Sequence, residues 1–458
     1  MDRSLPMAEP TLLVRNAALL VTMDDERREI AGGSLYAVGN RIAQVGPAAD
    51  LPQTADVVLD ASGMLILPGL VNTHHHLYQT LTRAVLAVQD AELFDWLTVL
   101  YRIWAGLDAE AVYISALLAM AELLLSGCTT TTDQLYLFPH GARVDDEIRA
   151  AQEIGMRFQP SRGGMSLGAS AGGLPPDFLT EDEDAILADC ERLIKRYHDP
   201  APRAMLRIAL APTSPFSVTR ELLVRSAVLA RRHGVTLHTH VAETRDEEVY
   251  CLERVGRRPL EYMADVGWLG PDVWLAHAVW LNEAEVEQLA ATGTGVAHCP
   301  SSNMRLGSGI APIAAMLSHG VHVGLGVDGS ASNDSSHMLA EVRQAMLLQR
   351  VAKGAAALSA RQALEMGTRL GAQALGRADI GALEPGRAAD LIGLRLDRLA
   401  YAGALSDPVA AAVFCQPQNV DLAVINGRVR VREGEVLGLD LPALVARHNA
   451  ISARLLGE

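Results

Sequence analysis

The sequence predicts a distorted, TIM-like (β/α)8 barrel joined to a small β-sandwich that is built from both ends of the chain. Three observations predict this α/β architecture. The middle of the chain alternates apolar strands with amphipathic helices in eight units, both ends are rich in short strands, and polar residues follow several strands of the middle. We place the barrel at residues 65–382 and the sandwich at residues 1–64 and 383–458.

Both ends of the chain consist of short apolar stretches separated by turn residues. Strands are expected at residues 12–16, 18–22, 34–38, 41–45, 390–394, 420–425 and 428–431. The pair Asn426–Gly427 between the last two is a hairpin signal. Because both ends share this character and the middle does not, one small domain assembled from the two ends is the simplest arrangement.

The middle of the chain carries the repeating strand and helix units. Its strands are expected at residues 65–72, 129–133, 157–162, 206–211, 235–241, 273–277, 295–298 and 321–328. Amphipathic helices are expected at residues 108–125, 183–197, 220–233 and 282–292. The Gly-, Ser- and Pro-rich stretch 163–176 is expected to be a long loop over the mouth of the barrel.

Composition limits the class of protein. The 458 residues are 49% hydrophobic, which is enough for a large core. The net charge of −15, without a block of basic residues, argues against nucleic acid or an anionic membrane as a partner. No apolar run is long enough to cross a bilayer without charges or breakers. Residues 1–11 lack the apolar region of a signal peptide.

The cysteines indicate the redox environment. There are five, an odd number, and none forms a CxxC pair. This pattern favours a reduced cytoplasm and argues against a disulfide framework or a thiolate zinc site. We therefore expect a cytoplasmic protein.

Three consecutive histidines close the first expected barrel strand. Side chains alternate along a strand, so His74 and His76 point the same way and His75 points away. Two imidazoles on one face can share a metal ion, although an ordinary buried pair also fits this motif alone. The later strands decide between these two interpretations.

Several other strands also end on groups that can bind a metal. They supply His240 near the end of the fifth strand and Glu243 just beyond it, and His277, His298 and Asp328 at the ends of the sixth, seventh and eighth strands. Imidazole nitrogens and a carboxylate suit zinc or another borderline divalent ion. The coincidence of strand after strand ending in this way favours a metal centre.

Each of these residues also has an ordinary structural interpretation. His238 fits a side chain packed inside the barrel, His277 a structural role, and Asp328 a helix cap. For His298 we favour a hydrogen bond to the following loop over metal binding.

These motifs resemble the amidohydrolase superfamily over nearly the whole chain. The resemblance rests on residues 68–76, the pair His240 and Glu243, His277, residues 326–328 and the closing segment 381–391. It implies that one metal ion, most often zinc and in some members iron, is bound by His74, His76, His240 and Asp328. The fourth strand ends at residues 208–214 without the bridging lysine of two-metal members, which implies a single ion.

Glu243, just beyond His240, is typical of the deaminase branch, where it moves protons and does not bind the metal. The implied enzyme is a hydrolase of C–N bonds in cyclic amidines. The metal lowers the pKa of its water towards about 7. In the implied mechanism Asp328 accepts a proton from that water, His277 orients it and stabilises the developing charge, and Glu243 protonates the ring nitrogen. A proton is then relayed to the amine, and ammonia leaves.

Four residues are candidates for substrate binding. In guanine deaminase relatives a Gln at the spacing of Gln79 contacts the purine edge, and Arg162 could donate two hydrogen bonds to a carbonyl-rich ring. A solvent-facing Gln79 and a loop-bracing Arg162 are the alternatives. Trp104 stands where adenosine-type relatives carry a ribose-binding Glu, which disfavours a nucleoside because indole accepts no hydrogen bond. Thr213 stands where close relatives can carry a different pocket side chain.

The segments 133–139, 151–166 and 173–177 resemble bacterial 8-oxoguanine deaminases. The expected reaction is therefore hydrolysis of 8-oxoguanine to urate and ammonia. Another heteroaromatic ring, such as guanine, a pterin or an s-triazine of the hydroxyatrazine type, is the first alternative. A non-catalytic scaffold is a remote one, because every expected ligand is present. The expected partner is a small heteroaromatic substrate. A homo-oligomer is possible, but the sequence does not determine the oligomeric state.

Overall fold

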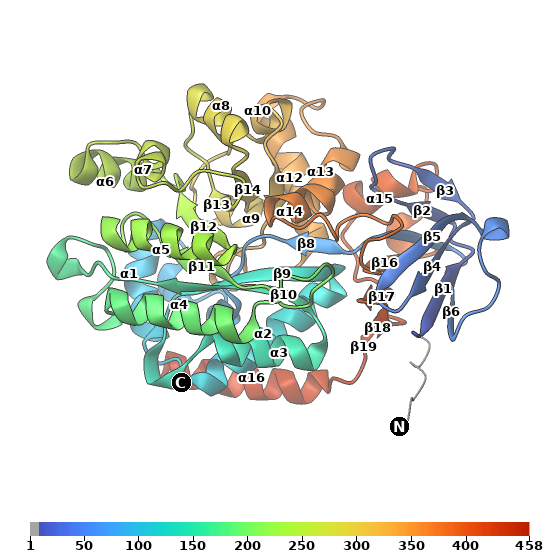
Figure 1. Ribbon diagram of the computed structural model, residues 1–458, viewed down its shortest axis with the longest axis horizontal. Helices are drawn as coiled ribbons and strands as arrows, with labels where there is room; N and C mark the ends of the chain where they lie inside the picture. Colours follow the sequence, from blue (N-terminus) through green and yellow to red (C-terminus); the bar gives the residue numbers. More distant parts are fainter. Residues whose placement is uncertain (1–8, 458) are drawn as a thin grey trace, which may run out of the picture.

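Eight parallel strands close into a barrel in this computed structural model, which describes residues 9–457 (Figure 1). The strands pair in chain order, and the eighth returns to the first. They are β8 (Leu70–Asn72), β9 (Cys128–Leu135), β10 (Arg157–Gly164), β11 (Ala209–Pro212), β12 (Thr236–Val241), β13 (Val273–His277), β14 (Gly295–His298) and β15 (Val323–Leu325). The predicted barrel is confirmed. Residues 1–8, part of the stretch in which the sequence predicts no signal peptide, lie outside the described range.

The first expected barrel strand is wrong in one respect. Residues 65–72 were expected to be one strand, but the chain forms β7 (Met64–Pro68) and then β8. β7 pairs antiparallel with β16 (Leu391–Arg395) in the small domain, whereas β8 joins the barrel. The break falls at Gly69, where a side chain would overlap that of Thr129. A glycine therefore lets the chain pass from one sheet to the other at close quarters.

Helices surround the barrel in Figure 1. They include α1 (Leu93–Trp104), α2 (Ala109–Leu125), α3 (Val144–Ile154), α4 (Glu183–Tyr197), α5 (Arg220–His233), α6 (Arg245–Val255), α7 (Pro259–Asp265), α8 (Glu283–Thr292), α9 (Pro300–Arg305), α10 (Ile313–Ser318), α11 (Ser330–Asn333), α12 (Met338–Lys353), α13 (Ala360–Met366) and α14 (Arg369–Ala374). The four expected helices are present. Side-chain caps explain where they begin, since Asp108, Asp182, Thr219 and Asn282 each accept a hydrogen bond from a backbone amide of the first turn.

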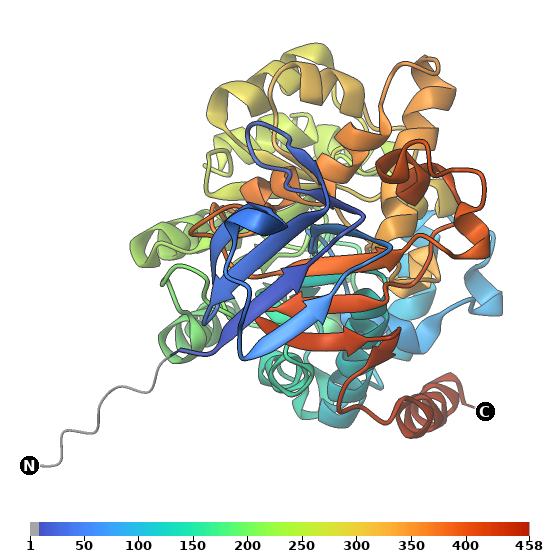
Figure 2. The same cartoon turned by 90° about the vertical axis from the view of Figure 1, so that its right-hand side faces the viewer.

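Both ends of the chain form the small β domain, as predicted (Figure 2). One sheet has the order β5-β4-β1-β6 and the other the order β19-β18-β17-β16-β7-β2-β3. The remaining strands are β1 (Thr11–Arg15), β2 (Leu19–Val21), β3 (Glu29–Ala31), β4 (Gly33–Val38), β5 (Arg41–Pro47), β6 (Val57–Asp60), β17 (Leu422–Ile425), β18 (Arg428–Arg432) and β19 (Glu435–Val436). Apolar side chains from both sheets, such as Val14, Leu35, Ile66 and Leu391, form their common core.

The last helix leaves the sheets and returns to the barrel. α16 (Leu441–Leu456) contacts α2 and the short helix η2 (Leu77–Thr82), beside which it lies in Figure 1. Its inner face buries Leu444, His448 and Ile451, which recur at helical spacing. A second late helix, α15 (Pro408–Phe414), packs on α12 and α13. Residues 441–456 therefore contact the barrel, although the sequence groups them with the small domain.

A buried ion pair joins the two parts of the molecule. Arg157 begins the barrel strand β10, and Asp390 precedes β16 of the small domain. The guanidinium donates Nε to Oδ2 of Asp390 at 2.8 Å and Nη2 to Oδ1 at 3.0 Å. Because both side chains are buried, this two-point contact fixes the orientation of one part against the other.

The sequence predicts no disulfide framework and no apolar run long enough to cross a bilayer. Each of the five cysteines is a free thiol, and four of them are buried. Among the helices of residues 9–457, none is long and apolar enough to pass through a bilayer.

Candidate active site

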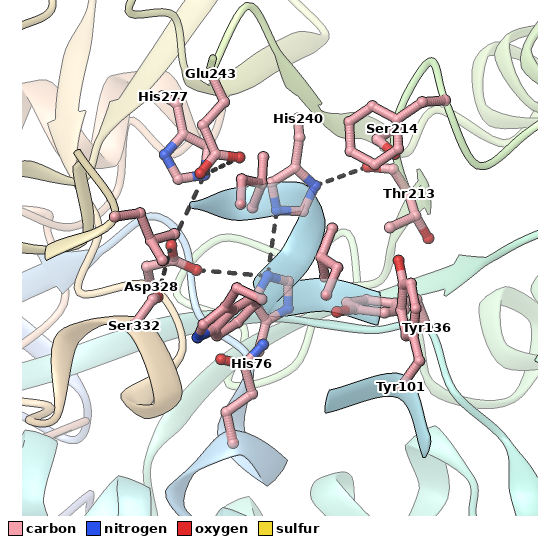
Figure 3. Close-up of a pocket in the computed structure, with 16 residues that line it drawn as sticks. His76, Tyr101, Tyr136, Thr213, Ser214, His240, Glu243, His277, Asp328 and Ser332 are labelled. Atoms are coloured by element: carbon pink, nitrogen blue, oxygen red, sulfur yellow. Dashed lines mark hydrogen bonds and ion pairs between the residues drawn. The ribbon is translucent and has the colours of Figure 1, made fainter. Parts of the chain in front are cut away.

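The polar residues that follow the barrel strands meet at one end of the barrel. His74 and His76 follow β8, and Asp328 follows β15. His240 lies in β12, and His277 is the last residue of β13. Parallel strands place their carboxyl ends at the same mouth of the barrel, so these side chains converge there. Figure 3 shows His76, His240, His277 and Asp328 around this mouth.

Four donor atoms lie close together in this mouth. Oδ1 of Asp328 is 3.3 Å from Nε2 of His74 and 3.5 Å from Nε2 of His76. Nε2 of His76 is 3.2 Å from Nε2 of His240. All four side chains are buried or nearly so. Two groups of three have donor atoms near enough to share one ion: one is His74, His76 and Asp328, and the other is His74, His240 and His277.

In His76 and His240, the hydrogen bond made by Nδ1 determines whether Nε2, which faces the other donor atoms, carries a hydrogen or a lone pair. Nδ1 of His76 lies 2.8 Å from the carbonyl oxygen of Gln134, and Nδ1 of His240 lies 2.7 Å from that of Thr213. A carbonyl only accepts, so both Nδ1 atoms carry the hydrogen. The two Nε2 atoms therefore face each other with lone pairs, an arrangement that a cation between them would stabilise.

The donor set fits a single divalent cation. Ligand atoms that bind zinc tetrahedrally at about 2.0–2.1 Å lie about 3.3–3.4 Å from each other. The three donor distances given above, 3.2 to 3.5 Å, fall around that value. Nε2 of His74 is buried and has no hydrogen-bond partner among the described residues. Burial holds the pKa of His74 and His240 well below the usual value, so both imidazoles are neutral and available as ligands.

Asp328 is held from its outer side. Its Oδ2 accepts a hydrogen bond from Oγ of Ser302 at 2.6 Å and from Oγ of Ser332 at 3.3 Å. Burial favours the neutral acid, but the surrounding histidines outweigh burial and hold the pKa of Asp328 well below its ordinary value. The side chain is therefore a carboxylate whose other oxygen, Oδ1, accepts the backbone N–H of Gly329 at 2.7 Å and faces His74 and His76.

Glu243 and His277 form a second group beside the donor set. Nε2 of His277 lies 3.5 Å from Oε2 of Glu243 and 3.8 Å from Oδ2 of Asp328. Nδ1 of His277 is 2.9 Å from Oδ1 of Asn303, an acceptor, so the ring donates there and turns Nε2 towards the two carboxylates. Burial raises the pKa of Glu243 to about 7, although His277 opposes this shift. Glu243 can therefore exchange a proton near neutral pH.

The backbone around this group is strained. Ala242, His277, Ala278 and Asp328 have φ values of 55°, 69°, 49° and 59°, in the left-handed region that disfavours residues with a side chain. Such strain occurs where the surrounding structure imposes it, and it is common at functional sites. In this barrel it turns the side chains at the strand ends inward.

A small cavity opens beside the donor set. Its polar wall includes Gln79, Thr213, Ser214 and Ser332, and its apolar wall is formed by Leu93, Trp96, Leu97, Tyr101, Tyr136, Phe216 and Leu306. Oε1 of Gln79 is buried without a hydrogen-bond partner among the described residues. Gln79 and Thr213 thus lie where a ligand could contact them. The aromatic wall suits a flat ring.

Two of the expected substrate-binding residues lie elsewhere. Arg162 is outside the wall of the cavity, and Glu181, Asp189 and the carbonyl of Gly163 accept its hydrogen bonds. The guanidinium is paired with these groups and braces the segment after β10, the alternative role considered for Arg162. Trp104 is also outside the wall of the cavity. Its indole N–H donates to Oγ1 of Thr82, and its ring packs against Trp96, a residue of the wall.

The structure also shows the contacts of three histidines outside the donor set. His75 faces Ser336, at 3.1 Å, and so points away from its two neighbours as expected. His298 was expected to form a hydrogen bond with the loop that follows it. This expectation is wrong, because neither ring nitrogen has a hydrogen-bond partner among the described residues. Burial lowers the pKa of His298 to about 3, so the ring is neutral. His238 packs inside the barrel, stacked on Trp274, and reaches His74 at 2.8 Å.

Several residues of the site carried little or no signal in the sequence. Ser302 and Asn303 follow His298 in a motif that is visible in the sequence, but their partners Asp328 and His277 come from other strands. Among the aromatic residues of the wall, Tyr101 comes from α1 and Tyr136 directly follows β9. Aromatic residues at such positions are usually part of a core, so pattern alone does not identify them.

The fold and this site define a class of protein, the metal-dependent hydrolases with a (β/α)8 barrel. A model of the Amidohydrolase family matches residues 65–430. The chain belongs to this family and is a hydrolase that acts on C–N bonds of heteroaromatic rings, a deaminase.

Individual relatives match almost the full length. The chain is 48% identical to 8-oxoguanine deaminase of Pseudomonas aeruginosa, covering 97% of this chain and 98% of the relative. It is 40% identical to hydroxydechloroatrazine ethylaminohydrolase of Pseudomonas sp. strain ADP, covering 95% and 94%. A solved structure of atrazine chlorohydrolase from Arthrobacter aurescens TC1, complexed with zinc, superposes with a TM-score of 0.93 at 35% identity, covering 96% of this chain and 100% of that one.

Proposed function

We propose that this deaminase hydrolyses 8-oxoguanine to urate and ammonia. The observation that carries the proposal is the arrangement of four donor atoms and Glu243 around one small aromatic cavity. Support for the oxidised purine comes from the 48% identity to an 8-oxoguanine deaminase, against 40% to an enzyme named for a triazine substrate.

The proposed cation is a single zinc ion, with iron as the alternative. His74, His76, His240 and Asp328 would hold it. When bound, the cation would make a water molecule acidic enough to supply hydroxide near neutral pH. The orphaned Nε2 of His74 and the lone pairs of His76 and His240 support this choice.

The chain's own residues then move the protons. Asp328 accepts the proton that the water molecule loses, and His277 stabilises the charge that develops between the two carboxylates. Glu243 gives a proton to the ring nitrogen beside the carbon that bears the amino group. The electrons of the addition then have an acceptor. The proton that Asp328 took is relayed to the amino group, and the C–N bond breaks to release ammonia. The hydroxyl that was added gives its proton to Glu243 as the ring carbonyl forms, so both carboxyl groups return to their starting state.

The cavity wall supports a free base over a nucleoside. Gln79 offers a buried amide oxygen, a hydrogen-bond acceptor for the N–H groups along a purine edge. Thr213 is less available, because its hydroxyl already donates to the carbonyl of Gly164 at 2.9 Å. Trp96, Tyr101, Tyr136 and Phe216 present apolar faces, which cannot satisfy a ribose diol.

Incubation of the purified, metal-loaded protein with 8-oxoguanine tests this proposal. Urate is followed by its absorbance and ammonia by a coupled assay, with guanine as the matched substrate that lacks the 8-oxo group. We expect kcat/KM for 8-oxoguanine to exceed that for guanine by at least about tenfold, the equivalent of about 1.4 kcal/mol of transition-state binding. An equal or lower value would remove the 8-oxoguanine assignment.

The second candidate keeps the chemistry and changes the ring to an s-triazine or a pterin. The relative from Pseudomonas sp. strain ADP favours the triazine. A panel of 8-oxoguanine, hydroxyatrazine and isoxanthopterin separates these candidates, because the residues that move protons serve all three rings equally. The ring with the highest kcat/KM identifies the substrate class.

A further inference from the structure

Glu247 makes an unusual contact beside the site. It lies in the first turn of α6 and is fully buried. Its Oε1 accepts the backbone N–H of Ala242 at 2.8 Å, and its Oε2 accepts the backbone N–H of Glu243 at 2.9 Å. Each carboxylate oxygen of Glu247 thus accepts one backbone amide, that of Ala242 or that of Glu243 itself.

These amides belong to a segment that needs support. Ala242 has a φ of 55°, so the chain turns sharply after β12, and buried amides there require acceptors. On the other side of the segment, the carbonyl oxygen of Ala242 accepts the N–H groups of Val279 and Trp280, both at 2.9 Å. The segment is therefore held between Glu247 and the chain that follows His277.

This contact differs from an ordinary helix cap. Thr244 caps α6, and a glutamate three residues later normally reaches back to the N–H of the capping residue itself. Glu285 does so in α8, where it accepts the N–H of Asn282. Glu247 reaches past Thr244 to the two preceding residues instead. Glu285 is thus a matched comparison: a buried glutamate at the same helix position, in a neighbouring unit of the barrel.

We propose that Glu247 is a positioning residue for Glu243: it fixes the peptide that aims the Glu243 carboxyl at His277. The proposal rests on the proton-transfer role given to Glu243 under the proposed function. Burial raises the pKa of Glu247 itself to about 7, although the two backbone N–H groups favour its carboxylate. The charged form of Glu247 favours the protonated form of Glu243. Consistent with this, burial raises the pKa of Glu243 to about 7, and Glu247 adds to that rise.

Glu247→Gln is the direct test. The amide keeps one oxygen and puts an NH2 group against the other backbone N–H, so one amide loses its acceptor. We expect kcat to fall by about 10²-fold, as a misplacement of roughly 1 Å does. KM and metal content are expected to stay unchanged. Glu247→Asp keeps the charge but shortens its reach, and the same loss is expected. Glu285→Gln, the control, should retain the wild-type kcat.

A double-mutant cycle separates positioning from a general structural effect. If Glu247 acts through Glu243, adding Glu247→Gln to Glu243→Gln should lower kcat by less than about twofold further. A further loss as large as in the wild-type background would overturn the proposal, as would a normal kcat in Glu247→Gln.

Amide hydrogen exchange tests the same contact without any activity. We expect slow exchange at Ala242 and Glu243 in the wild-type protein and faster exchange in Glu247→Gln and Glu247→Asp, with Glu285→Gln unchanged at these amides. Should the wild type deaminate none of the rings in the panel, the proposed function would fail, and this exchange measurement would still decide the positioning contact. Unaltered exchange in both Glu247 variants would overturn it.

Discussion

A hydrogen bond between His238 and His74 determines which ring nitrogen of His74 carries a hydrogen and which has a lone pair. Nδ1 of His238 lies 2.9 Å from the carbonyl oxygen of Trp274, so it carries the hydrogen. Nε2 of His238 is then an acceptor, 2.8 Å from Nδ1 of His74. His74 must donate to it, which leaves Nε2 of His74 with a lone pair that faces Asp328.

Replacement of His238 should therefore weaken metal binding although His238 is not a proposed ligand. We expect His238→Ala to lower the affinity for Zn²⁺ by about 10–100-fold, the usual effect of losing such an outer partner. Competition with a chromophoric chelator measures the affinity. His75→Asn is the control, because His75 is buried beside the ligands but contacts Ser336. A loss of the same size in both variants would contradict the assigned role.

Glu243→Gln should abolish most of the activity and spare the metal. Gln has nearly the same shape but cannot give a proton to a ring nitrogen, so kcat should fall by about 10²–10⁴-fold. Steady-state kinetics on the best ring of the panel, together with metal analysis, checks this. A variant that loses its metal, or one that keeps wild-type kcat, would show that Glu243 has another role.

The buried pair Arg157 and Asp390 should contribute strongly to stability. Arg157→Met leaves a buried carboxylate without its partner, which costs about 3–5 kcal/mol in comparable pairs. Denaturation by urea measures the loss. Arg447→Met is the control, since Arg447 and Glu110 form an exposed pair expected to contribute less than about 1 kcal/mol. Similar losses in both variants would argue against the two-point contact between the barrel and the small domain.

His448 should make stability depend on pH. Burial and the nearby Arg83 lower the pKa of His448 to about 4, whereas an unfolded histidine titrates near 6.5. Between about pH 6.5 and pH 4 the unfolded chain therefore binds the proton more readily, and the stability that is complete above pH 6.5 declines as the pH falls.

The variant His448→Gln isolates this effect, because its amide can still donate to Oγ1 of Thr80, 3.0 Å from Nε2 of the histidine. The melting temperature should drop less between pH 7.5 and pH 5.0 in the variant than in the wild type. Equal drops would mean that His448 is not the titrating group.

The sequence predicts the barrel well because its strands are buried on both faces and end on polar residues. It misplaces residues 65–68, since one apolar run holds both β7 and β8 and only the close approach of Gly69 to Thr129 separates them. It also extends the last barrel strand to residues 321–328, although regular pairing is confined to Val323–Leu325. The remainder of that run carries the irregular turn that aims Asp328 inward.

The grouping of the proposed ligands can be predicted from the sequence because they repeat one pattern at strand ends. Contacts between distant segments are not. For Arg162 the sequence leaves a ring contact and a loop-bracing role open, and it does not indicate the pairing with Glu181, 19 residues away in the chain. Glu247 looks like one of several acidic residues on an exposed helix and instead supports the backbone of Glu243. Such assignments depend on loop conformation, which local pattern does not determine.

Anomalous diffraction at the zinc edge from crystals of the metal-loaded protein tests the central claim most directly. We predict one peak per chain, about 2.0–2.2 Å from Nε2 of His74, His76 and His240 and from a carboxylate oxygen of Asp328. A peak elsewhere, or one that excludes any of these four side chains from the first coordination sphere, would contradict the account.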